Sequence, residues 1–255
     1  MAKYSKKKKK KNGGRIALLV ILLLLLALLI WLAILLEHQE VPLLEPGNVQ
    51  TTEPEKPLEI QTLPQMTEPD PMELSDGLRI LSVGKYTGMY MEDGTNEIVT
   101  DVMMIVLENA AGQDLQLARI NLEYPGITME FEVTNVPAGE KVVILEKNRR
   151  PMQTEEILSV QTRNVVFFPE KMKLREDQFQ ITGSNGSLKV TNISGADITG
   201  DVYIYYKNSA SDLLYGGITY RSSVKGGLAA GMSVSIIAGH YSPDTCRIVQ
   251  VDVIQ

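Results

Sequence analysis

Hydrophobic and polar residues follow three successive patterns along the chain. Residues 16–36 are an unbroken run of Leu, Ile, Val and Ala with one Trp and no charge. Residues 37–75 show no apolar period, whereas from residue 78 onward apolar and polar positions alternate over short stretches. Because successive side chains of a strand point to opposite faces, the last pattern predicts an all-β region.

The alternating stretches are separated by residues that favour turns. Asp93-Gly94 and Pro125-Gly126 supply backbone conformations that tight connections need. We therefore predict strands over residues 78–91, 98–108, 115–124, 127–133, 142–146 and 157–168. Short strands at this spacing, without long helical patterns, are typical of an antiparallel sandwich.

Two motifs of this region recur later in the chain. Asn109-x-x-Gly112 recurs as Asn192-x-x-Gly195, and Val136-x-Ala138-Gly139 recurs as Leu228-x-Ala230-Gly231, at offsets of 83 and 92. A longer loop within residues 207–217 explains the difference between the offsets. The pattern predicts a duplicated module with a packed boundary near Phe168-Pro169. The segment 170–178 is either a short helix or a loop.

Further motifs in residues 181–238 suggest a family. They are Gly186-x-Leu188-x-Val190-x-Asn192-x-x-Gly195, the run Val202-Tyr203-Ile204-Tyr205-Tyr206, and Leu228-x-x-Gly231. With them the segment resembles the FxLYD-type modules of bacterial envelope proteins. The resemblance implies an immunoglobulin-like sandwich without known catalysis. Lys207 departs from the pattern, because it stands where the family usually carries Asp after Tyr.

The resulting fold class is all-β. We expect two tandem immunoglobulin-like antiparallel β-sandwiches, over residues 76–168 and 169–255, the second of them FxLYD-like. They follow a single N-terminal transmembrane helix and a disordered linker.

The apolar run of residues 16–36 has the length of a membrane span. As a helix its 21 residues extend about 31 Å, close to the ~30 Å hydrocarbon core of a bilayer. A basic tail, residues 1–15, precedes it and contains Lys6, Lys7, Lys8, Lys9, Lys10, Lys11 and Arg15. Positive charge stays on the cytoplasmic side, so the N-terminus is expected inside and the C-terminal domains outside, in the cell membrane as a single-pass protein.

Two alternatives remain for this run: a cleaved signal peptide and a buried core helix. Signal peptides have shorter apolar regions and end in a small-x-small site, which Ala33-Ile34-Leu35 matches poorly.

Composition and charge characterise the outer part of the chain, which is everything after the apolar run. Residues 37–75 hold seven of the twelve prolines and nine acids, which predicts an extended acidic linker. The first 15 residues carry +8 and the remainder −14, so nucleic acid is not an expected partner of the outer part. The lysine run is expected to lie against anionic headgroups. Cys246 is the only cysteine, so disulfide-free domains of a bacterial envelope protein are favoured.

Catalytic and metal motifs are weak. The loop from His240 to Cys246 contains Ser, His, Asp and Cys, but members of a triad converge from separate elements, so a hairpin turn with a buried thiol is favoured. The turn from Glu92 to Glu97 offers the oxygen ligands that Ca²⁺ prefers, although a plain turn also explains it. We predict no enzyme activity, no cofactor and no metal.

Tyrosine provides the candidate binding residues. In a strand, Val202, Ile204 and Tyr206 face the core, which leaves Tyr203 and Tyr205 on the outer face. Tyr215 or Tyr220 lies near them if its strand is a neighbour. Tyrosine is favoured at interfaces, so the four are candidates for contact with a protein or glycan. The alternative is that they pack against the other module or coat the sheet.

The leading functional hypothesis is a membrane-tethered extracytoplasmic binding or scaffolding protein of the bacterial cell envelope. A sensory or regulatory ectodomain that acts through a membrane partner is the alternative. An enzyme is the third possibility.

Overall fold

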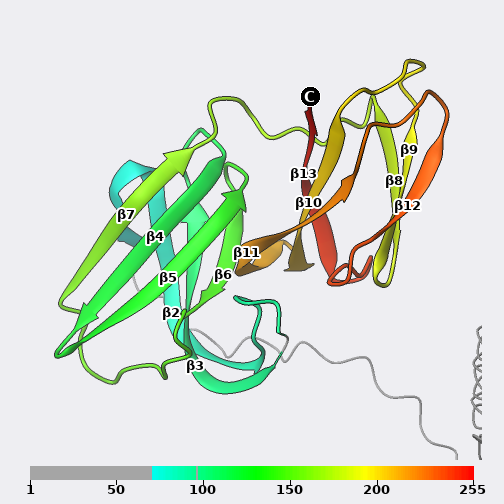
Figure 1. Ribbon diagram of the computed structural model, residues 1–255. Helices are drawn as coiled ribbons and strands as arrows, with labels where there is room; N and C mark the ends of the chain where they lie inside the picture. The colour runs from blue at the N-terminus through cyan, green and yellow to red at the C-terminus, as the bar shows by residue number, and fades with distance from the viewer. Residues whose placement is uncertain (1–70, 96) are drawn as a thin grey trace, which may run out of the picture. The chain divides into compact units, whose positions relative to one another are not determined.

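The computed structural model describes residues 71–95 and 97–255, which lie within one compact unit, Glu59–Gln255 (Figure 1). The predicted basic tail, transmembrane helix and most of the acidic linker lie outside these residues. Within the described ranges no helix is long and apolar enough to cross a membrane.

This part of the chain is all-β, as the alternating pattern predicted. One 3₁₀ turn, η1 (Ser75–Gly77), accompanies thirteen strands. The strands are β1 (Met72–Glu73), β2 (Leu78–Met89), β3 (Ile98–Asn109), β4 (Leu115–Tyr124), β5 (Ile127–Val136), β6 (Lys141–Leu145), β7 (Ser159–Phe167), β8 (Phe179–Ser184), β9 (Ser187–Asn192), β10 (Asp201–Ala210), β11 (Leu213–Val224), β12 (Ser233–Ile237) and β13 (Cys246–Ile254).

The strands form three sheets. One sheet has seven strands in the order β1-β2-β3-β6-β11-β10-β13, and two sheets have three strands each, β5-β4-β7 and β12-β9-β8. The strands β1–β7, here the first module, and β8–β13, here the second module, share a topology. The order β2-β3-β6 opposite β5-β4-β7 recurs as β8-β9-β12 opposite β11-β10-β13.

A buried asparagine ends β3 in the first module and β9 in the second. Asn109 Nδ2 donates to the carbonyls of Gln113 and Val136, and Asn192 Nδ2 donates to those of Ala196 and Leu228. Both side chains are fully buried. Each asparagine therefore satisfies backbone groups that the turn leaves without ladder partners. The two motifs recognised in the sequence thus make the same hydrogen bonds at the same offsets.

Each three-stranded sheet packs on one part of the large sheet. The first core contains Leu78, Ile105, Ile120, Phe131 and Ile144, from β2 to β6. The second core joins Phe179, Leu188 and Val190 with residues of β10, β11 and β13. The connecting segment after Phe168 contains no helix, only a turn at residues 176–178.

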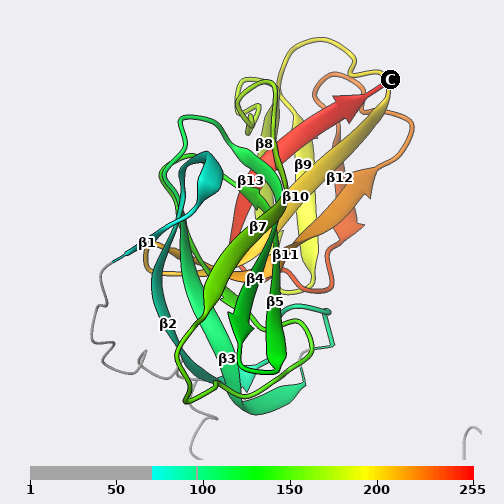
Figure 2. The same ribbon diagram turned by 90° about the vertical axis from the view of Figure 1, so that its left-hand side faces the viewer.

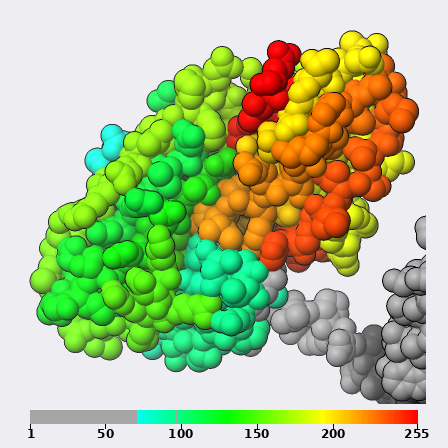
Figure 3. All heavy atoms as spheres, viewed as in Figure 1, coloured from blue at the N-terminus to red at the C-terminus, as the bar shows by residue number. Residues whose placement is uncertain are grey.

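The β10–β11 hairpin joins the two modules. Residues 207–217, expected as a loop, instead continue β10 to Ala210 and start β11 at Leu213, because Ser211 adopts a positive φ of 52° and closes a tight turn. Leu213–Tyr215 then pairs in parallel with Lys141–Val143 of β6. Leu214 is fully buried in the first core. In Figure 3 the atoms of β11 lie directly against those of the first module.

Candidate functional site

The four candidate tyrosines do not gather on one surface. Tyr203 and Tyr205 share a face of β10 and are partly buried, and Tyr205 packs against the first core. Tyr215 is only 8% exposed and lies in a third apolar cluster with Tyr90. Tyr220 pairs across the strands with the core residue Tyr206, so it shares the inner face. Tyr215 and Tyr220 pack against apolar clusters, so they do not form one surface with Tyr203 and Tyr205.

Tyr203 lies among charged side chains of its own sheet. The Lys225 ammonium lies 4.6 Å and the Arg221 guanidinium 5.0 Å from its ring centroid. Lys225 Nζ also donates to Asp201 Oδ2 at 2.7 Å, and this contact lowers the pKa of Asp201. The ring is thus already covered by two cations of its own sheet.

The acidic turn is occupied by an arginine. Arg149 Nη2 lies 2.6 Å from Asp93 Oδ2, and Nη1 lies 2.5 Å from Glu97 Oε2. Asp93 Oδ1 accepts the N–H and the hydroxyl of Thr95. Burial raises the pKa of Asp93, but the bonds from Thr95 and Arg149 outweigh it and lower the pKa. The Asp93 and Glu97 carboxylates, which the sequence offered to Ca²⁺, are therefore engaged within the protein.

The loop before β13 ends at a buried thiol. Cys246 is buried, and its Sγ lies 3.3 Å from Asn208 Oδ1 and from the His240 carbonyl oxygen. Burial raises the pKa of the Cys246 thiol. The His240 ring stacks on Tyr220 with centroids 4.4 Å apart. The prediction of a buried thiol is confirmed.

A buried lysine lies where the modules meet. Opposite Lys207, four residues of β11 (216–219) form a bulge, because Tyr206 pairs with Tyr220 while Asn208 pairs with Tyr215. Lys207 Nζ donates to the carbonyls of Gly217 at 3.0 Å and Ile218 at 2.8 Å, within the bulge. The lysine thus satisfies carbonyls that a bulge removes from the ladder.

The same lysine reaches the first module. Lys207 Nζ donates to the Thr134 carbonyl of β5 at 3.0 Å. The bulge approaches β5 so closely that a Cβ at Gly217 would lie 1.8 Å from the Glu132 carbonyl oxygen. Only glycine fits this contact between backbones.

Glu92 holds the bulge from the other side. Its carboxylate accepts the N–H of Gly217 at 2.7 Å and that of Leu145, in β6, at 2.8 Å. Burial raises the pKa of Glu92, and these two N–H groups and Lys207 act against the rise. Burial likewise lowers the pKa of Lys207, against the attraction of Glu92. Glu92 and Lys207 therefore bind the N–H and the C=O of the same glycine.

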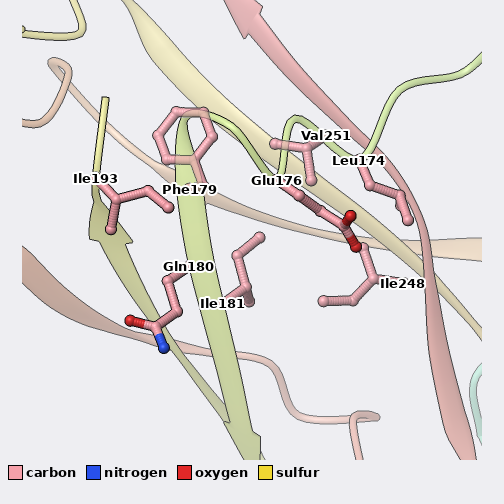
Figure 4. A pocket seen from close by; sticks show the side chains of 8 residues that line it. All are labelled: Leu174, Glu176, Phe179, Gln180, Ile181, Ile193, Ile248 and Val251. Carbon is pink, nitrogen blue, oxygen red and sulfur yellow. The ribbon is translucent and has the colours of Figure 1, made fainter. Parts of the chain in front are cut away.

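An open apolar groove lies in the second module, between the edge strands β8 and β13. Its volume is about 500 Å³, and its lining includes Leu174, Glu176, Phe179, Ile181, Ile193 and Ile248. Figure 4 shows the Glu176 carboxylate on the same side of β8 as Leu174 and Ile248. Leu174 is 41% and Ile193 50% exposed. Sequence reasoning missed this groove, although Leu174 and Ile193 stand out as apolar residues next to turns.

No family model matches this chain, and neither the curated proteins nor the solved structures contain a match.

Proposed function

We propose that the chain is a membrane-tethered extracytoplasmic binding or scaffolding protein of the bacterial cell envelope, and that it is not an enzyme. The uncharged apolar run, the lysines before it and the acidic Pro-rich linker support a tether with the C-terminal part outside. The disulfide-free β region supports a bacterial envelope location.

The observation that carries the binding role is the set of contacts that fixes the two modules to each other, here called the joint. One sheet runs through both modules, Leu214 of the second lies in the core of the first, and Lys207 bonds to both. Domains that share such a joint move as one body, whereas default interdomain contacts allow relative motion. A rigid body on a spacer suits the presentation of a surface to a partner at a set distance from the membrane.

The strand order supports an immunoglobulin-like assignment within this proposal. Six strands in two opposed three-stranded groups recur in both modules. Such sandwiches serve many binding functions, which come from their surfaces rather than from the fold. We place both modules in this class, the second as FxLYD-like with Lys207 in place of the usual Asp.

Two measurements on intact cells test the proposal. Protease added to wall-stripped cells should digest residues 76–255 without lysis. Crosslinking followed by mass spectrometry should link the same residues to envelope proteins or glycan. Protection of residues 76–255 until lysis would overturn the sidedness, and crosslinks confined to cytoplasmic proteins would overturn the envelope role.

A further inference from the structure

The groove has a closed counterpart in the first module. There β1 adds to the edge of β2, with Met72 paired to Ile80, and Figure 2 shows the two strands side by side. The chain after β1 then reaches β7, where the hydroxyls of Ser75 and Thr162 are hydrogen-bonded. Leu74 N then donates to the Leu78 carbonyl at 2.8 Å. Met72 and Leu74 both pack against the first core. An extended segment with apolar residues at alternate positions thus closes this side.

The second module has different residues at these positions. Leu78 and Phe179 correspond, because each opens its strand and pairs with the buried asparagine of its module. Counting back from them, Lys173 and Arg175 stand where the first module has Met72 and Leu74. Cationic side chains cannot fill an apolar opening without a large desolvation cost.

The connecting segment also bonds to a different strand. The Lys173 carbonyl accepts the N–H of Val251 at 2.8 Å, and Arg175 Nε donates to the Val251 carbonyl at 3.1 Å. Both contacts are to β13. In the described part of the chain, β9 is the only strand that pairs with β8, so the other side of β8 is an unpaired edge. Such an edge is a template for another strand.

The charge of the groove indicates what kind of segment it binds. Glu176 is the one charged side chain among the described residues that line the groove. A carboxylate at the border of an apolar groove favours an occupant that brings a cation next to its apolar side chains. The closed side of the first module shows the backbone and spacing that such an occupant needs.

We propose that the groove between β8 and β13 binds an extended segment of a separate envelope protein, which adds to the edge of β8 as β1 adds to β2. The segment carries apolar residues at positions i and i+2, which enter the groove over Ile181 and Ile248, and a Lys or Arg that meets Glu176. Main-chain hydrogen bonds supply affinity and the alternate side chains supply specificity. This inference rests on the proposed function and names the kind of partner.

Site-specific photocrosslinking in intact cells tests the proposal with the full chain. A photoreactive residue replaces Gln180 or Ile193 at the groove, or Ser235 on the opposite edge strand β12 as the matched position. We expect Gln180 and Ile193, but not Ser235, to capture a segment of another envelope protein with the stated pattern. Leu174→Lys should reduce capture at Gln180 at least fivefold, whereas Leu158→Lys, at an equally apolar but 66% exposed position in the first module, should not.

Strand addition has a second readout. A synthetic peptide of the captured segment should slow amide hydrogen exchange in residues 180–183 of the purified full chain. Capture of residues 37–70 of the same chain, capture of a second copy, equal capture at Ser235, or unchanged exchange in β8 would each overturn the proposal. One of these contrary results can appear while residues 76–255 remain extracytoplasmic and crosslink to envelope proteins elsewhere. In that case the proposed function stands, and only the assignment of the groove as a peptide-binding site fails.

Discussion

In the first module Met72 and Leu74 cover the side between β2 and β7, whereas in the second module the corresponding side between β8 and β13 stays open. The other side of the first module is closed as well, because Leu214 enters between β5 and β6. Both of these sides are thus covered in the first module, whereas the second module, with the same strand order, leaves one side open. The comparison teaches that edge residues outside the shared strands, and not the sandwich itself, decide where a surface is left for a partner.

The largest expected effect comes from removing the contact that both modules share. Lys207→Ala leaves the carbonyls of Thr134, Gly217 and Ile218 without this donor and Glu92 without its cation. Breaking such a buried site costs about 3–5 kcal/mol. We expect calorimetry to show two unfolding transitions in place of one. Lys189→Ala, at an exposed position of β9, should change neither the free energy of unfolding nor the number of transitions. A single, unshifted transition in Lys207→Ala would show that the lysine does not couple the modules.

A pair of leucines compares the closed side with the open one. Leu214→Ala removes a fully buried side chain from the first core and should lower the free energy of unfolding by about 3 kcal/mol. Leu174→Ala acts on a side chain that is 41% exposed and should cost less than about 1 kcal/mol. Urea titration measures both. Equal losses would mean that the groove is closed in solution.

The two buried asparagines test whether the modules are equivalent. Asn109→Ala and Asn192→Ala each leave two carbonyls without a donor, which costs about 2 kcal/mol. We expect similar shifts of the urea midpoint from both variants. Asn121→Ala, on the partly exposed face of β4, is the control and should have little effect. A much smaller loss for one of the pair would contradict the equivalence.

The smallest expected effect is the pH dependence of the joint. Burial raises the pKa of Glu92 above its ordinary 4.5, so the folded protein binds this proton more tightly than the unfolded chain. The contribution of Glu92 to stability is therefore greatest below pH 4.5 and decreases as pH rises toward neutral. Glu92→Gln should remove this decrease between pH 4.5 and 7. Parallel stability curves of the two proteins over this range would contradict the assignment.

Local features of the structure could be predicted because they depend on neighbouring residues. Pro125-Gly126 separates β4 from β5 where the sequence indicated, and the repeated Asn and Gly positions correspond to the same turns in both modules. Val202, Ile204 and Tyr206 are buried, as period-two alternation requires.

The joint could not be predicted because its contacts are distant in sequence. Lys207 was recognised only as a departure from a family pattern, since the Thr134 carbonyl that it binds lies 73 residues away. The parallel pairing of Leu213–Tyr215 with Lys141–Val143 involves three residues on each strand and leaves no periodic signal. The bulge begins at Gly216-Gly217, and this pair of glycines has no hydrophobic pattern that would predict it. The packing of Tyr215 and Tyr220 against apolar clusters could not be predicted either, because the bulge changes which residues of β11 face the core.

The position of Leu214 has a consequence for how the protein matures. Leu214, Tyr205 and Val249 come from the second module, yet they pack in the core of the first. A chain that is synthesised from its N-terminus presents β1–β7 well before these three residues arrive. Until these residues are present, the apolar interior of the earlier strands is exposed to water. Partly folded proteins with such exposed surface aggregate or bind chaperones. Release of a chain truncated before residue 205 should therefore yield a species that depends on a holdase, whereas the full chain completes its own interior.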